Sequence, residues 1–330
     1  MPVEPSWLRD YSDKTIVVTG ASGFLGRRLV NRLAGIGCRI VRVTRTAPIS
    51  LQPPPTATVI DVPGDLRDPS VWDRVVPDAD VIVHFAAQTS VAIAADDPAR
   101  DLEANVGPMR HLLAACRQRQ RRPTILFAGT VTQAGVPSRL PVDEDAPDAP
   151  VTVYDQHKLL AERELERSVS AGQACGASLR LANIYGPRSE DTSHHRDVLN
   201  RMIRAALRGE TLTVFGTGHY VRDYLFVDDA VEAFLMAGVR ADRVNGRHYV
   251  VGSGRGTTIR KAFELVAERV ETLTGRHVRV TDADPDQPLS GLDRRNFVAN
   301  SSRFTADTGW QPHWTLPDGI DRTIETFACE

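Results

Sequence analysis

Tyr154 and Lys158 are spaced so that their side chains can do chemistry together. They lie four residues apart in the segment 154–170, which is rich in Leu, Ala and Glu and predicts a helix, so both share one helix face. A free phenol has a pKa near ~10, and a nearby ammonium lowers that pKa. The pair is therefore suited to exchange a proton with an alcohol or ketone oxygen, although the same spacing also fits a half-buried tyrosine beside a solvated lysine.

Thr130 is the hydroxyl expected to join this pair. It follows the apolar strand predicted at 124–128, and ligands bind at the carboxyl ends of the strands in a parallel sheet. Its hydroxyl is expected to hydrogen-bond the substrate oxygen that Tyr154 protonates, and the simpler interpretation is a turn cap. Together the three side chains predict hydride transfer at an oxygen-bearing carbon.

A glycine-rich turn indicates the hydride carrier. Gly20, Gly23 and Gly26 follow the strand predicted at 15–19 and open the helix predicted at 24–33. The chain must turn sharply at the first glycine, a pyrophosphate must approach the backbone at the second, and the helix must pack on the sheet at the third. The helix N-terminus then offers free N–H groups to the phosphates. This context predicts dinucleotide binding.

The end of the second strand bears on the choice between NAD and NADP. An acid there would accept hydrogen bonds from a ribose 2′-hydroxyl, and this chain has Arg45 instead, which can hold a 2′-phosphate. We therefore expect NADP(H), with NAD(H) as the alternative if Arg45 is only a surface arginine. Asp65 and Leu66, after the third strand, are expected beside the adenine, and Asp65 could also cap the following helix.

The elements that must position these residues alternate along the chain. Short apolar segments at 15–19, 38–44, 58–62, 80–85, 124–128 and 178–182 read as strands, and 24–33, 98–116 and 154–170 as helices. This alternation predicts an α/β fold, a Rossmann-type doubly wound parallel sheet. After Asn183 the pattern becomes irregular. We expect a dinucleotide-binding domain at 1–182 plus about 226–248, and a smaller C-terminal substrate-binding lobe at 183–225 and 249–330.

Composition excludes several classes of protein. A formal net charge of -2 argues against nucleic-acid binding by bulk charge. No apolar run approaches ~20 residues, so no membrane span is expected. The first fourteen residues are polar, without the apolar core of a signal peptide, which predicts a cytoplasmic protein. The four cysteines have no C-x-x-C spacing, so neither a disulfide framework nor a metal site is expected.

With these residues in hand, the chain resembles the extended short-chain dehydrogenase/reductases, the nucleotide-sugar epimerase/dehydratase family. The resemblance runs from about residue 15 to residue 323. It rests on TGASGFLG at 19–26, GDL at 64–66, HFAAQTSV at 84–91, YDQHK at 154–158, RLANIYGP at 180–187, FGTGHYVRDYLFVDD at 215–229 and TGWQP at 308–312.

The resemblance implies a role for each matching residue. The catalytic residues are Thr130, the acid/base Tyr154 and its activator Lys158. The cofactor contacts are Gly20, Ser22, Gly23, Phe24, Leu25, Gly26, Arg45, Asp65, Leu66, Phe85, Ala86, Ala87, Asn105, Ala128, Tyr154, Lys158 and Leu181. The contacts to a nucleotide-diphosphate sugar are Gln88, Ser90, Thr130, Thr132, Asn183, Arg222, Tyr224 and Asp293. His84 is expected in the core at a strand end, and a homodimer is expected.

Two departures from the family pattern narrow the chemistry. The 4,6-dehydratases of the family carry an Asp-Glu pair straight after the catalytic threonine, and this chain has Val131 and Thr132 there. Neither can serve as an acid or base, which argues against 4,6-dehydration. The late Arg-x-Gly-Asp pattern of the family lacks its arginine here and reads SGLD at 290–293.

Within the family, FAGTVTQAG at 127–135 and TVYDQHKLLAE at 152–162 look like the NDP-4-keto-6-deoxyhexose 4-ketoreductases of deoxysugar biosynthesis. The main expectation is therefore NADPH-dependent reduction of a C4 ketone, with Tyr154 as the proton donor. The alternative is an NAD-dependent nucleotide-sugar 4-epimerase with the same residues. A dinucleotide-sensing module without catalysis is disfavoured, because sensing needs no acid/base group.

Overall fold

The computed structural model describes residues 5–45, 55–188, 198–284 and 294–329. The strands are β1 Thr15–Thr19, β2 Arg39–Thr44, β3 Thr58–Pro63, β4 Val81–His84, β5 Thr124–Thr130, β6 Cys175–Leu181, β7 Asn183–Tyr185, β8 Leu212–Phe215, β9 Val221–Phe226, β10 His248–Val251, β11 Gly256–Thr258 and β12 Val280–Ala283. The α-helices are α1 Phe24–Leu33, α2 Pro69–Val75, α3 Val91–Asp96, α4 Pro98–Asn105, α5 Gly107–Gln118, α6 Val153–Ser170, α7 Val198–Leu207, α8 Val227–Val239, α9 Ala241–Val244, α10 Ile259–Thr274, α11 Ser302–Thr308 and α12 Leu316–Ala328. Two short 3-10 helices, η1 and η2, cover Ser6–Tyr11 and Val131–Ala134.

The main sheet has seven strands in the order β10-β6-β5-β4-β1-β2-β3. Every neighbouring pair in it is parallel. The chain order reverses between β1 and β4, which is where a doubly wound sheet opens a crevice for ligands beyond its carboxyl ends. The predicted fold class is confirmed, and the glycine loop after β1 lies at this reversal.

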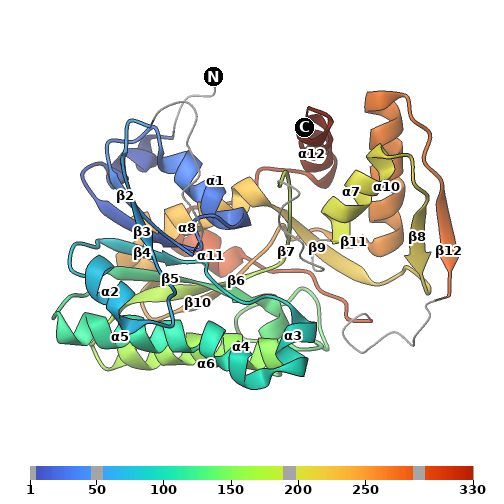
Figure 1. Cartoon of the computed structure of the whole chain (residues 1–330). Coiled ribbons are helices and arrows are strands. Elements are labelled where there is room, and N and C mark those ends of the chain that lie inside the picture. The colour runs from blue at the N-terminus through green and yellow to red at the C-terminus, as the bar shows by residue number, and fades with distance from the viewer. Residues whose placement is uncertain (1–4, 46–54, 189–197, 285–293, 330) are drawn as a thin grey trace.

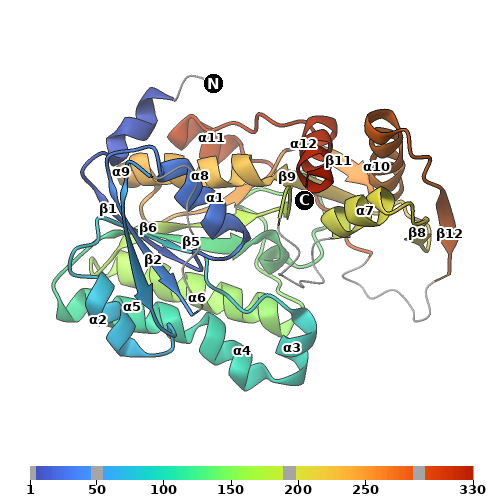
Figure 2. The same cartoon turned by 45° about the horizontal axis from the view of Figure 1, so that its top comes forward.

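Helices cover both faces of this sheet, as Figures 1 and 2 show, with α2, α5 and α6 on one face and α1 and α8 on the other. Each face has its own apolar core. Because both faces are covered, the strands carry near-continuous apolar sequences, and all five residues of β1 are buried. The sheet is thereby a rigid platform for groups at its edge.

A second group of elements lies beside the carboxyl edge of the main sheet (Figure 1). It contains a three-stranded sheet, β11-β9-β7, and the pair β12-β8, with α7, α10 and α12 packed together. A third apolar core fills it. The sequence pattern ends the dinucleotide-binding domain at about residue 248. In the structure β10, which belongs to the main sheet, continues to Val251. The division into two domains stays a prediction.

The single helix predicted at 98–116 is wrong. The structure has two helices there, α4 and α5, with Val106 between them. Pro108 has no backbone N–H, so it cannot donate to the carbonyl four residues earlier in a continuous helix. The break lets α4 end at Asn105, a residue of the predicted site.

Among the described residues, no helix is both long enough and apolar enough to cross a membrane. The cytoplasmic location stays a prediction. The same residues hold no group of three His, Cys, Asp or Glu side chains arranged to bind a metal ion.

Candidate active site

The glycine loop has the geometry that its sequence predicts. Gly20 has a φ of 64°, and a Cβ there would lie 2.8 Å from the backbone nitrogen of Ala86, just after β4. A Cβ on Gly26 would overlap the carbonyl oxygen of Gly20. Gly23 is the N-cap residue of α1 without any capping side chain. The loop is therefore held close to both β4 and α1, and the first N–H groups of the helix lack a side-chain cap, which fits a dinucleotide diphosphate.

The other predicted cofactor residues surround this crevice. Ser22 lies in the turn before α1, Phe24 and Leu25 are the first two residues of that helix, and all three are half-buried. Five more lie at or just after the carboxyl ends of strands in the main sheet. They are Phe85, Ala86 and Ala87 after β4, Ala128 near the end of β5 and Leu181 at the end of β6. The fold thus brings them to one edge of the sheet.

Arg45 and Asp65 follow the neighbouring parallel strands β2 and β3. Arg45 is exposed directly after β2. The carboxylate of Asp65 accepts hydrogen bonds from the Arg67 side chain at 3.0 and 3.1 Å, and these bonds lower the pKa of Asp65 to about 2. The helix cap suggested for Asp65 is wrong, because α2 begins at Pro69 and Asp68 caps it, accepting from Ser70. Leu66 beside them is buried.

Tyr154 and Lys158 lie on α6, and both are buried, at 5% and 3% exposure. The helix begins at Val153, because Thr152 and Asp155 form a capping box that satisfies the first backbone N–H groups. The Lys158 ammonium lies 4.0 Å from the ring centroid of Phe127 on β5, an attractive cation–π contact. α6 therefore holds both side chains against the end of β5, as their shared helix face predicts.

Thr130 is the last residue of β5 and also the N-cap of the 3-10 helix η2. The Thr130 backbone N–H donates to Oε1 of Gln133 at 2.9 Å, and its hydroxyl accepts from the N–H of Thr132 at 3.3 Å. The Thr130 and Thr132 hydroxyls are 2.9 Å apart, and the Thr132 hydroxyl donates to the Asp155 carboxylate on α6. Thr130 thus caps a turn and is also connected to the start of the helix that carries Tyr154.

A buried carboxylate organises the residues after β4. Asp101 is fully buried on α4. It accepts from Nε2 of Gln88 at 2.6 Å and from Nδ2 of Asn105 at 3.0 Å, and Nδ1 of His157 lies 2.7 Å from it. The Asn105 side chain also accepts from the backbone N–H of Gln88 and donates to its carbonyl, both at 3.0 Å. Ser90 caps α3. Asn105, Gln88 and α6 are therefore connected through one group that the sequence analysis missed.

The predicted sugar-nucleotide contacts beyond the main sheet come together on β7 and β9. Asn183 is paired with Tyr224 across these strands, and Arg222 lies two residues before Tyr224. The Arg222 guanidinium donates to the carbonyl of Val221 at 3.1 Å and to that of Arg295. Burial raises the pKa of the Tyr224 phenol to about 12, so it stays neutral. Asp293 lies outside the described residues.

His84 lies at the end of β4, as expected of a core residue. It is 1% exposed, stacks on Phe127, and its Nδ1 lies 2.8 Å from the Thr19 hydroxyl. The same hydroxyl oxygen also accepts from the N–H of Ala86 at 3.2 Å, so it connects the ring of His84 to the backbone that follows β4. Burial and the Lys158 charge lower the pKa of His84 to about 3. A neutral ring is inert as a general acid near neutrality.

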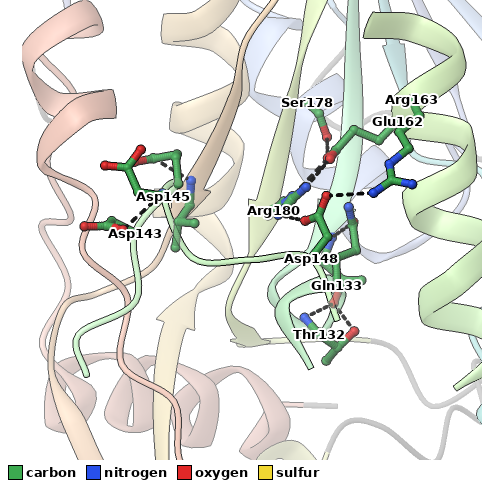
Figure 3. A network of polar contacts seen from close by, with 12 residues as sticks. Thr132, Gln133, Asp143, Asp145, Asp148, Glu162, Arg163, Ser178 and Arg180 are labelled. Carbon is green, nitrogen blue, oxygen red and sulfur yellow. Dashed lines mark hydrogen bonds and ion pairs between the residues drawn. The ribbon is translucent and has the colours of Figure 1, made fainter. Parts of the chain in front are cut away.

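A second buried network fixes α6 on the sheet. Arg180 of β6 is 3% exposed and lies between Glu162 of α6 and Asp148 of the preceding loop, as Figure 3 shows. Glu162 also accepts from the Ser178 hydroxyl at 2.5 Å, and Arg180 lies 2.7 Å from Asp148. A cation and two carboxylates from three segments therefore hold the helix that carries Tyr154.

A cavity of about 540 Å³ lies beside the end of β10, the outermost strand of the main sheet on the side of β6. None of the predicted catalytic or cofactor residues lines it. Its walls are formed by Leu140, Pro141, Gly252, Ser253, Gly254, Val298, Ala299, Asn300, Ser301, Ser302, Thr305 and Pro312.

This geometry can be compared with known proteins. Residues 16–252 match the model of the NAD dependent epimerase/dehydratase family. The chain belongs to this family. It is 31% identical over 316 residues to a UDP-glucose 4-epimerase of Mycolicibacterium smegmatis, an alignment that spans 94% of this chain and 97% of the relative. A dTDP-L-rhamnose 4-epimerase of Burkholderia thailandensis is 24% identical over 96% of this chain and 95% of its own.

Solved structures give the same picture. The UDP-glucose 4-epimerase of Thermotoga maritima, crystallised with UDP-glucose, has a TM-score of 0.83 and 28% identity over 96% of this chain and 99% of its own. The UDP-glucose 4-epimerase of Thermus thermophilus, in complex with NAD, has a TM-score of 0.80 and 29% identity over 95% and 99%. These relatives favour the epimerase alternative over the ketoreductase, and the Thermus thermophilus enzyme was solved with NAD. The chain is a nicotinamide-dependent enzyme of the short-chain dehydrogenase/reductase type.

Proposed function

We propose that this protein is an NAD-dependent 4-epimerase of a nucleoside-diphosphate hexose, with UDP-hexoses as the substrate class. The observation that carries the proposal is similarity over nearly the whole chain to 4-epimerases, in a molecule that keeps Thr130, Tyr154 and Lys158 at the sheet edge. The 4-ketoreductase is the second candidate, supported by Arg45 where an acid would select NAD.

The chain's own residues have defined tasks in this proposal. The Tyr154 phenolate takes the proton of the sugar O4 and later returns it, and the positive charge of Lys158 on the same helix face favours the phenolate. Thr130 holds the same oxygen by hydrogen bonding. Arg222 contacts the diphosphate of the nucleotide. When bound, NAD supplies a reversible hydride acceptor for C4.

The glycine loop supports the nicotinamide cofactor by its shape. A side chain at Gly20 or Gly26 would collide with the backbone of Ala86 or of Gly20 and push the loop, β4 and α1 apart, whereas the lack of a side chain at Gly23 lets a diphosphate approach the backbone. We propose NAD rather than the NADP(H) expected from Arg45, because an epimerase returns its hydride and has no need to exchange cofactor. Arg45 is exposed and then acts as a surface arginine.

Two measurements on the purified protein test the proposal. Mass spectrometry of the cofactor released on denaturation is expected to find stoichiometric NAD. Proton NMR with UDP-glucose or UDP-galactose, without added cofactor, is expected to show both C4 epimers forming with no net change in NADH. Consumption of NADPH with a 4-keto-6-deoxy sugar, without epimerisation, would establish the ketoreductase instead. Tight cofactor binding without turnover on either class of sugar would mean a binding module.

The homodimer expected from the family resemblance belongs to the same proposal. Light scattering coupled to size-exclusion chromatography tests it, and a monomer mass at assay concentration would refute it.

A further inference from the structure

The chain of hydroxyls behind Thr130 ends on a carboxylate that the reaction described above leaves unused. Asp155 is 1% exposed. It accepts the proton of the Thr132 hydroxyl, and the Thr132 oxygen lies 2.9 Å from the Thr130 hydroxyl oxygen. Thr132 occupies the second position after the catalytic threonine, where the dehydratases of the family carry their glutamate. In this chain the carboxylate is therefore that of Asp155, and the Thr132 hydroxyl lies between it and Thr130.

The direction of each bond in this chain follows from counting protons. An ionised carboxylate only accepts, so the single proton of Thr132 is donated to Asp155. The Thr132 oxygen must then accept from Thr130, whose own proton is used in that bond. The Thr132 N–H already donates to one lone pair of the Thr130 oxygen. With Asp155 ionised, Thr130 therefore presents its remaining lone pair to the substrate oxygen.

We propose that Asp155 is a positioning residue that sets the direction of the Thr130 hydroxyl and ends a proton relay through Thr132. This inference rests on the proposed function, because the relay needs a sugar oxygen beside Thr130. An ionised Asp155 suits an alcohol substrate, which donates to Thr130. A protonated Asp155 reverses every bond of the chain, so that Thr130 donates to a ketone oxygen.

The relay offers the single proton of O4 an alternative route to the one through Tyr154, and its atoms and charges balance. The O4–H bond breaks and its proton goes to the Thr130 oxygen. Thr130 passes its own proton to Thr132, and Thr132 passes its proton to Asp155, which becomes a carboxylic acid. A nicotinamide held at the glycine loop would accept the hydride from C4, which balances the oxidation of the alcohol. Reduction of the ketone runs the same steps backwards.

The competing explanation is that Asp155 only caps α6. Its carboxylate accepts from the N–H of Thr152 at 3.4 Å, and its own N–H donates to the Thr152 hydroxyl at 3.1 Å. A cap would affect folding stability, whereas a relay affects the rate of the chemical step. Thr152→Ala removes half of the capping box and leaves the hydroxyl chain in place, so it is the matched control.

The test is a double-mutant cycle of Asp155→Asn and Thr132→Val, two changes that keep side-chain shape. For each purified variant we would measure kcat and KM for epimerisation, the content of bound NAD and Tm. The relay predicts that each single variant lowers kcat about tenfold, the cost of about 1.4 kcal/mol in the barrier, with unchanged KM and NAD content. The double variant should be no slower than either single one. Thr152→Ala should lower Tm and leave kcat within about twofold of the unmodified enzyme.

Other outcomes would overturn the relay. Asp155→Asn with unchanged kcat, or single effects that multiply in the double variant, would show that no proton path joins the two residues. A Thr152→Ala variant as slow as Asp155→Asn would reduce Asp155 to a helix cap. If the unmodified protein fails to epimerise any UDP-hexose, the proposed function fails and the relay with it. If the unmodified protein epimerises normally and the variants do not behave as predicted, only the relay is refuted.

Discussion

At the scale of single residues, the proposal depends most on the Tyr154 phenol. Tyr154→Phe removes only the hydroxyl, so we expect turnover to fall by about 10²–10⁴-fold, the usual contribution of a positioned acid/base group. Bound NAD should stay stoichiometric, because the ring and the glycine loop remain. NMR assays of epimerisation measure the first effect and mass spectrometry of released cofactor the second.

Tyr11→Phe is the matched control for that variant. The Tyr11 hydroxyl donates to the carbonyl of Leu235 at 2.7 Å in the core. Its removal should lower stability by about 1 kcal/mol, because a buried hydrogen bond is lost, and leave turnover unchanged. Full activity of Tyr154→Phe would contradict the proposed chemistry.

His84 gives a prediction for acid stability. Its pKa is lowered to about 3 in the folded protein from 6.5 when unfolded, so the unfolded chain binds more protons between these values. Its stabilising contribution is complete above pH 6.5 and is lost as the pH falls towards 3. His84→Asn keeps an acceptor near the Thr19 hydroxyl but does not titrate. The unfolding free energy of this variant should therefore depend less steeply on pH, by about 1.4 kcal/mol per pH unit between pH 6 and 4.

Urea unfolding of both proteins at a series of pH values measures this difference. The variant should be less stable at neutral pH, because it loses a packed ring between Trp72 and Phe127. Parallel pH profiles for the two proteins would contradict a neutral, buried His84.

At the scale of elements, the contact between the glycine loop and α1 sets the shape of the cofactor crevice. Gly26→Ala places a Cβ against the carbonyl oxygen of Gly20, so α1 must move outwards. We expect a loss of about 1–3 kcal/mol in stability, typical of overpacking, and loss of co-purified NAD. Thermal unfolding and cofactor analysis measure both.

Gly37→Ala is the control for that change, because no atom lies within 4 Å of a Cβ at Gly37. It should retain both Tm and bound NAD. Retention of stoichiometric NAD by Gly26→Ala would show that the crevice tolerates a displaced helix.

The attachment of α6 to β6 is the second element-scale feature. Glu162→Gln leaves the buried Arg180 guanidinium with Asp148 as its remaining carboxylate (Figure 3). Removing one member of a buried ion pair typically costs about 3–5 kcal/mol, and Asp148 should hold the cost near the lower end. Chemical denaturation measures it.

The exposed pair Arg208 and Glu210 provides the comparison, since both side chains are more than half exposed. Glu210→Gln should leave stability nearly unchanged, because solvent screens this exposed pair. Equal effects at Glu162 and Glu210 would mean that the buried network does not fix α6 to the sheet.

At the scale of the whole molecule, Asp229 connects the start of α8 to the segment before α12. Its carboxylate accepts from the N–H groups of His313 and Trp314 at 3.0 and 3.1 Å. Burial raises its pKa to about 6, even though these bonds oppose the shift. The folded protein then binds more protons than the unfolded chain between about pH 4 and pH 6, so Asp229 favours folding as the pH falls. It opposes the acid sensitivity that His84 causes.

Asp229→Asn removes this compensation. On acidification from pH 6 to 4 the variant should lose stability more steeply than the unmodified protein, by up to about 1.4 kcal/mol per pH unit. Urea unfolding across that pH range measures the slope. A shallower slope in the variant would show that Asp229 is ionised throughout.

The sequence by itself determined the local features of this protein. The bounds of β1 and α1 were predictable to the residue, because burial on both faces and the glycine turn are encoded by neighbours in the chain. The shared face of Tyr154 and Lys158 followed from helical periodicity. The order of strands and helices likewise predicted a doubly wound sheet.

Only the tertiary structure decided which distant groups meet. Thr132 and Asp155 are 23 residues apart, and Asp101 and His157 are 56 apart. Hydrogen bonds between such residues depend on how helices pack on the sheet, and no periodicity in the chain records that packing. The break at Val106, which Pro108 causes, also places Asn105 beside Gln88. The sequence therefore specified the reacting groups, whereas the packing of α4 and α6 on the sheet specified the polar groups that hold and orient them.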